Sequence, residues 1–178
     1  MKLIKELIRR LMRLLMWPVG CIYKRRNGTT STEARHEMPN EVLLGLVSQK
    51  LAEGHTTTIW VKGYSMRPFI EYGRDRVKLA PVSALHVGDA VLAQISPGHY
   101  VLHRIIEIKG DDITLQGDGN LYGVEQCHAA DVCGIVTEYI RPNRTLFASD
   151  PHLIRRIRLW RKLRPIRRLL LFVYKSYV

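Results

Sequence analysis

The sequence is poor in cysteine, with only Cys21, Cys127 and Cys133. An odd and low number of cysteines provides no disulfide framework. Cys127, His128 and Cys133 lie close together, but they lack the second pair of ligands that a zinc site needs. We therefore predict ordinary core cysteines. The sequence predicts no metal site and no cofactor.

Long hydrophobic runs are also missing from both ends of the chain. The uncharged stretch of the first segment, Leu14 to Tyr23, has ten residues, and the apolar stretch Leu169 to Tyr174 has six. A helix that spans a membrane needs about 20. Charges also interrupt the apolar part of the first segment, which argues against a cleaved signal peptide. We expect no transmembrane helix.

Acidic residues are nearly absent from the two ends, although the chain carries a net charge of +12. Residues 1–26 hold eight Lys/Arg and one Glu, and residues 151–178 hold nine Lys/Arg and no acid. The middle is therefore slightly acidic. This distribution favours ends that meet an anionic membrane surface over a nucleic-acid-binding body. It leaves the oligomeric state open.

Both basic ends have the apolar spacing of an amphipathic helix. For residues 1–26 we predict a helix in the membrane interface, and the alternative is a helix packed on the protein's own core. Residues 27–38 are polar and predict a linker. In the tail, residues 148–178, Asp150 is expected to cap a helix that Pro165 interrupts. Its apolar stripe is Leu153, Ile154, Ile157, Trp160 and Leu163.

The middle, residues 39–147, predicts one short helix followed by β-strands. The helix is expected from Asn40, as its N-cap, to Glu53, with Gly54 ending it. Turn residues then separate short apolar segments with no helices between them, which argues against a doubly wound α/β fold. The predicted strands are TTTIWVKG, DRVKLA, AVLAQI, YVLHRIIEI, DITLQ and VCGIVTEYI.

Three residues of this middle could form a catalytic set. Ser65 follows an apolar strand, His103 lies within the run Val101–Ile106, and Asp118 closes a later strand. A serine hydroxyl needs a base that removes its proton, and the base needs an acid that orients it. Each residue alone also has a simpler interpretation, as a loop serine, a buried histidine and a turn aspartate.

The order and the local sequences of the segments around these residues favour the catalytic interpretation, because they resemble the signal peptidase and LexA-type serine peptidase superfamily. The resemblance covers roughly Thr57 to Val136. It implies a mainly β fold of the complex LexA and signal peptidase type, with flanking amphipathic helices at both termini. The matching pieces, in chain order, are GYSMRPFI, GRDRVKLAPVSALHVGDAVLAQI, YVLHRIIEI, LQGDGN and DVCGIV.

The resemblance also implies a role for each catalytic residue. Ser65, in the Ser-Met-x-Pro box, is the nucleophile, and its backbone N–H contributes to the oxyanion hole. His103 is the base, since His103-Arg104 is similar to the His-Arg pair of the archaeal and endoplasmic-reticulum branch. Asp118 matches the first acid of that branch. The second acid is expected about six residues later, where Val124 stands and Glu125 is the nearest carboxylate.

The implied substrate is a peptide or precursor protein that binds as an added β-strand beside Gly63 and Met66. With no transmembrane anchor, we expect a peripheral enzyme on the cytoplasmic membrane, at its cytoplasmic face, that removes a leader. Two alternatives remain open. One is a non-catalytic peptide-binding module on the same fold, and the other is a self-cleaving LexA-like regulator.

Overall fold

The computed structural model describes residues 39–175. The helix expected over residues 1–26 and the linker expected over residues 27–38 lie outside this range. Within it, the elements follow the order α2, seven strands and a short 3₁₀ helix, then β8 and the C-terminal helices. The helices are α2 (Asn40–Ala52), η1 (Ala129–Asp131), α3 (Pro151–Lys162), η2 (Arg164–Ile166) and α4 (Arg167–Lys175). The strands are β1 (Thr57–Trp60), β2 (Arg76–Ala80), β3 (Ala90–Ser96), β4 (His99–Lys109), β5 (Asp112–Gln116), β6 (Glu125–His128), β7 (Val132–Arg141) and β8 (Arg144–Phe147).

The described strands form one eight-stranded sheet in the order β1-β2-β7-β3-β4-β5-β6, and β8 pairs with β7. Every pairing is antiparallel. The prediction of a mainly β protein without βαβ units is therefore confirmed. The long strands β3, β4 and β7 lie side by side in the centre, so the residues on β4 have a rigid support on both edges.

The sequence located six strands and missed two. β6 and β8 have four residues each, which is too short for a visible alternation of apolar and polar residues. The cap of α2 was also wrong: Pro39 is the N-cap, and Asn40 is already in the first turn. Gly54 has a φ of 87°, as expected for a glycine that follows a helix.

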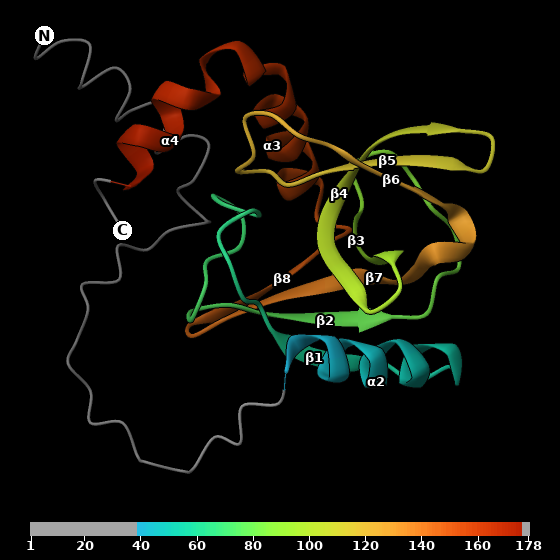
Figure 1. Ribbon diagram of the computed structural model, residues 1–178. Coiled ribbons are helices and arrows are strands. Elements are labelled where there is room, and N and C mark those ends of the chain that lie inside the picture. Colours follow the sequence, from blue (N-terminus) through green and yellow to red (C-terminus); the bar gives the residue numbers. More distant parts are fainter. Residues whose placement is uncertain (1–38, 176–178) are drawn as a thin grey trace, which may run out of the picture.

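The start of α3 and the interruption at Pro165 lie where the sequence predicts. The Asp150 side chain accepts a hydrogen bond from the His152 backbone N–H at 2.7 Å, and Pro151 opens α3. Pro165 lies in η2, which separates α3 from α4. Figure 1 shows α2 beside β1 and β2, well apart from α3 and α4. Of the described helices, none combines the length and the apolar character needed to cross a membrane.

The apolar stripe of the C-terminal helices lies inside the main hydrophobic core. Leu153, Ile157 and Trp160 of α3 join the same cluster as Phe69 and Ile70 of the Ser65 segment. Leu170, Leu171 and Tyr174 of α4 belong to it as well. Residues on both sides of the predicted boundary at residue 147 therefore share one hydrophobic core. The removal of these apolar side chains from water favours the packing of α3 and α4 on the body.

A second, smaller cluster fills the space between β3, β4, β5 and β6. It contains Cys127 together with Ile105, Ile113 and Leu115. Burial raises the pKa of the Cys127 thiol to about 11, so this sulfur stays protonated and unreactive at neutral pH. Cys127 therefore behaves as the core cysteine that the sequence predicts.

Replacing Trp160 should destabilise the whole domain. Its side chain is fully buried, packs edge to face on Phe69, and donates from Nε1 to the Asp118 carbonyl at 2.8 Å. We expect Trp160→Ala to lower the free energy of unfolding by about 3–5 kcal/mol, as other buried aromatic truncations do. Urea denaturation followed by circular dichroism measures this. Leu159→Ala, at an exposed position of α3, is the control and should change stability little. An equal, small effect of both variants would contradict the integrated core.

Candidate active site

Ser65 lies in a compact turn between β1 and β2. The residues after it enter the core: Met66 and Phe69 are 2% and 3% exposed. Their backbone closes local turns, in which Phe69 N–H and Ile70 N–H both donate to the Met66 carbonyl. Ser65 itself is half-buried and lines a cavity of about 850 Å³. Met66 and Phe69 thus anchor the turn in the core, while Ser65 stays accessible from the cavity.

The glycine turn at residues 117–119 packs directly on the Ser65 backbone. Gly119 N–H donates to the Ser65 carbonyl at 2.7 Å. A Cβ atom on Gly117 would lie 2.5 Å from the same carbonyl oxygen, and one on Gly119 would lie 2.9 Å from the Tyr64 carbonyl oxygen. Atoms do not approach that closely, so both positions need glycine for the two segments to meet.

His103 is held by an acid on a neighbouring strand. Its side chain is 8% exposed, and Nδ1 lies 2.8 Å from Oε2 of Glu125 on β6. A carboxylate on Nδ1 fixes the orientation of the imidazole and leaves Nε2 for another partner. The structure therefore gives His103 the support that a general base needs.

Asp118 has a different partner from the one expected. Its carboxylate accepts from Nε and Nη2 of Arg104, with distances of 2.6 to 3.0 Å, and both side chains are buried. Burial acts to lower the pKa of Arg104, but the charge of Asp118 outweighs it and raises that pKa above the ordinary value. Asp118 therefore neutralises Arg104, and Glu125 is the acid that orients His103.

The strand register places His103 beside the strand that leads into the glycine turn. Its neighbour Arg104 pairs with Gln116, the last residue of β5, and Gly117, against which the Ser65 carbonyl packs, follows Gln116 directly. No hydrogen bond joins the Ser65 hydroxyl to His103 within residues 39–175. Catalytic hydrogen bonds are often long before substrate binds and tighten in the complex.

Arg104 also binds the segment that contains Gly88 and Asp89. Its Nη1 donates to the Gly88 carbonyl at 2.7 Å, while Gly88 N–H donates to the Ile105 carbonyl and Ile105 N–H to the Asp89 carbonyl. The Gly88-Asp89 pair therefore clamps the start of β3 to β4. The Arg104 guanidinium also lies over the Phe69 ring, 5.5 Å from its centroid, so three segments far apart in the sequence, at Phe69, Gly88 and Asp118, meet at Arg104.

The two residues expected to bind substrate, Gly63 and Met66, differ in exposure. The Met66 side chain is buried in the core, so it is the backbone of Met66 that a substrate strand could contact. Gly63 is exposed and has a φ of 84°, a conformation that glycine adopts without strain. The Ser65 N–H donates to no group within the described residues, which leaves it free to act as an oxyanion donor.

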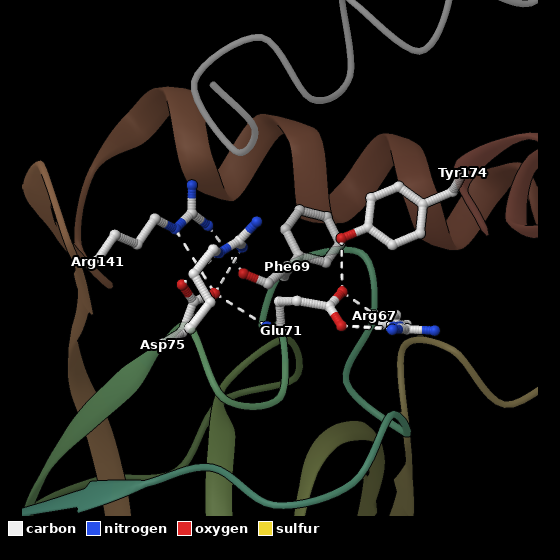
Figure 2. Close-up of polar contacts among 7 residues, drawn as sticks. Arg67, Phe69, Glu71, Asp75, Arg141 and Tyr174 are labelled. Carbon is white, nitrogen blue, oxygen red and sulfur yellow. Dashed lines mark hydrogen bonds and ion pairs between the residues drawn. The ribbon is translucent and has the colours of Figure 1, made fainter. Parts of the chain in front are cut away.

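A buried polar network connects the Ser65 turn to α4, as Figure 2 shows. Glu71 accepts hydrogen bonds from the Arg67 guanidinium on one side. On the other side it accepts from the Tyr174 hydroxyl of α4 at 2.8 Å. Burial, reinforced by the charge of Glu71, raises the pKa of Tyr174, so the hydroxyl remains a donor at all working pH values. Arg67 is two residues from Ser65, so α4 supports the Ser65 turn.

Tyr174→Phe should destabilise the protein by removing one hydrogen bond of this network, without leaving a cavity in the core. The ring remains, and only a hydrogen bond to a charged, buried acceptor is lost. We expect stability to fall by about 1.5–3 kcal/mol, the usual range for such a bond. Thermal denaturation measures the loss, with Phe172→Tyr, at an exposed position of α4, as a control for general helix effects. An unchanged melting temperature in Tyr174→Phe would contradict a structural role for this network.

Comparison with protein-family models, curated proteins and solved structures finds no match for this chain. The interpretation of the site therefore depends on its own geometry. Sequence reasoning missed the contribution of α3 and α4 to it. The pattern that could have revealed this is the apolar stripe with Trp160 in it, because a large aromatic side chain on such a stripe is more typical of a core helix than of a surface helix.

Proposed function

We propose that this chain is a serine endopeptidase of the signal peptidase type, on a β fold of the LexA and signal peptidase kind. Ser65 is the nucleophile, His103 is the general base and Glu125 orients His103. The substrate is a peptide or a precursor protein from which a leader is cut. The observation that carries the proposal is the buried His103 with its Nδ1 on Glu125, on the strand that pairs with β5, directly after which comes the glycine turn that packs on Ser65.

The reaction follows from the roles of these groups. Nε2 of His103 takes the Ser65 hydroxyl proton as Oγ attacks the scissile carbonyl, and Nδ1–H donates to Glu125 as the imidazolium forms. The Ser65 N–H stabilises the oxyanion. The C–N bond then breaks, and the proton passes from His103 to the leaving amine. Water next attacks the acyl ester in the same way and restores Ser65.

Digestion of a peptide library tests the proposal. The purified full-length protein is incubated with a mixed peptide library, with and without anionic liposomes, and new termini are mapped by mass spectrometry. We expect cuts at a restricted set of sites. Intact mass of the protein in the same samples reports self-cleavage, the behaviour of a LexA-like regulator. Peptide binding with no cuts in either condition would favour the non-catalytic peptide-binding module instead.

We also propose that the enzyme works at the surface of the cytoplasmic membrane, on its cytoplasmic face. Residues 1–26 supply the main attachment, because the stripe of α3 is occupied by the core. Each basic residue near an anionic surface contributes about 1 kcal/mol.

Removal of residues 1–26 should therefore abolish most binding to phosphatidylglycerol vesicles while the domain stays folded. Vesicle co-sedimentation at low and high salt measures the binding. Full-length protein should be released by high salt, and phosphatidylcholine vesicles are the uncharged control. Undiminished binding of the shortened protein would contradict attachment through this segment.

A further inference from the structure

The cavity at Ser65 has one wall that comes from α4. Ser65 and Leu121, of the loop after Gly119, form its inner side, and the outer wall includes Arg168, Leu169 and Lys175. With a volume of about 850 Å³, it is within the range of sites that hold several side chains. A peptide bound in this cavity would therefore meet both Ser65 and the α4 wall.

The wall combines apolar surface with uncompensated positive charge. Leu169 is 48% exposed, and the largely buried Leu171 also lines the cavity. Arg168 and Lys175 form no ion pair within the described residues, and no acidic residue lines the cavity. The third cation of the lining, Arg67, is already bound to Glu71.

The wall is fixed relative to the nucleophile. On its inner face, α4 buries Leu170 and Tyr174, and Tyr174 binds Glu71 of the Ser65 segment. At the start of α4, Arg167 donates to the Asn120 carbonyl at 3.2 Å and stacks over Trp160. Arg168 and Lys175 are seven residues apart, so they lie on one face of the helix. The spacing between these side chains and Ser65 is therefore set before a substrate arrives.

We propose that this α4 wall is a specificity subsite for peptides with an apolar side chain next to acidic residues, close to the bond that is cut. The inference rests on the proposed peptidase function. Leu169 and Leu171 take the apolar side chain, and Arg168 and Lys175 pair with the acidic ones. A membrane lipid headgroup and a second copy of this chain are the rival occupants, but the continuity of the wall with Ser65 favours the peptide.

The two kinds of contact should contribute unequally. Losing an apolar side chain from a hydrophobic pocket lowers binding or kcat/KM by about tenfold or more. Exposed charge pairs are weaker, and each should change affinity by about two- to fivefold at moderate salt. The apolar residue of the substrate is therefore the main determinant, and the acidic residues refine the choice.

Matched peptides and variants of the full-length protein test the subsite. Short alanine-based fluorescent peptides carry Glu-Leu-Glu, Glu-Ser-Glu or Lys-Leu-Lys in the centre. Binding is measured by fluorescence anisotropy with Ser65→Ala protein, which needs no turnover, and kcat/KM is measured with protein that retains Ser65. The test variants are Leu169→Gln and Arg168→Glu. Leu159→Gln and Arg158→Glu make the same changes at exposed positions of α3 outside the cavity.

We expect Glu-Leu-Glu to bind most tightly, Leu169→Gln to remove its advantage over Glu-Ser-Glu, and Arg168→Glu to shift the preference towards Lys-Leu-Lys. The α3 controls should behave as the parent protein does. Preferences unchanged by either α4 variant would overturn the subsite while leaving the peptidase proposal intact. Binding as expected without cleavage would keep the subsite and overturn the peptidase.

A lipid headgroup or a second copy of the chain on this wall would each give a different experimental result. If Arg168→Glu weakens binding to phosphatidylglycerol vesicles and leaves all peptide affinities unchanged, the wall contacts lipid and the proposal fails. If analytical ultracentrifugation shows a dimer that Leu169→Gln dissociates, with peptide affinity unchanged, the wall is a self-association surface and the proposal fails as well.

Discussion

Ser65→Ala is expected to abolish peptide cleavage, with a loss of kcat of about 10⁶-fold, as in other enzymes that lose the nucleophile of a triad. The reason is chemical, because no acyl-enzyme can form without the Oγ atom. The fold should be unaffected, since Ser65 is half-buried and its contact with Gly119 is made by the backbone carbonyl. Single-turnover cleavage of a peptide found in the library digest measures the rate.

The matched control is Ser83→Ala, which changes an exposed serine in the loop before β3. It should cleave at the parent rate, and both variants should keep the parent circular dichroism spectrum and denaturation midpoint. Turnover by Ser65→Ala at more than a few per cent of the parent rate would contradict the assignment of the nucleophile.

Glu125→Gln is expected to lower kcat by about 10⁴-fold, the loss seen when the orienting acid of a triad becomes an amide. A glutamine at this place can hold His103 in the wrong tautomer and cannot stabilise the imidazolium. Stability should change little, because the Glu125 side chain is 26% exposed and glutamine has the same shape. Glu107→Gln, on the exposed part of β4, is the matched control and should retain activity.

Asp118→Asn should produce the opposite pattern. It leaves the buried guanidinium of Arg104 without its counter-ion, and removing one partner of a buried pair costs about 3–5 kcal/mol of stability. Denaturation midpoints and single-turnover rates, measured on all three variants, separate the two carboxylates. If Asp118→Asn is stable and inactive while Glu125→Gln is active, Asp118 is the orienting acid and the assignment made from the structure is wrong.

The sequence predicts the architecture well where local patterns are strong. The strands with four or more alternating or apolar residues were located within a few residues, and Asp150 with Pro151 marked the start of α3. It failed at β6 and β8, whose four residues take their structure from pairing with β5 and β7. Edge strands of this length depend on their neighbours, which single-sequence patterns do not record.

The candidate site was predictable in its residues but not in its pairings. The Ser-Met-x-Pro box and the His-Arg pair pointed to Ser65 and His103. The choice between Asp118 and Glu125 was left open, because it depends on which face of the sheet each carboxylate occupies. His103 and Arg104 are adjacent and so point to opposite faces of β4. One therefore meets Glu125 and the other Asp118.

The packing of the C-terminal helices on the body could not be predicted from the sequence. A basic helix with an apolar stripe fits a membrane surface and a protein core equally well by periodicity. The choice between these two depends on whether the body has apolar surface that the helix can cover. Here that surface lies around Phe69 and Ile70. The same packing brings Leu169 and Arg168 to the cavity at Ser65, which is why the substrate preference proposed for α4 could not be anticipated.

Trapping of the acyl-enzyme tests the central claim most directly. Full-length protein is mixed with a cleavable peptide, quenched in acid within a single turnover, and analysed by intact-mass and peptide-mapping mass spectrometry. We predict a mass increase equal to the acyl portion of the peptide, located on Ser65 and absent from Ser65→Ala. Cleavage without any adduct on Ser65, or at the same rate in Ser65→Ala, would contradict it.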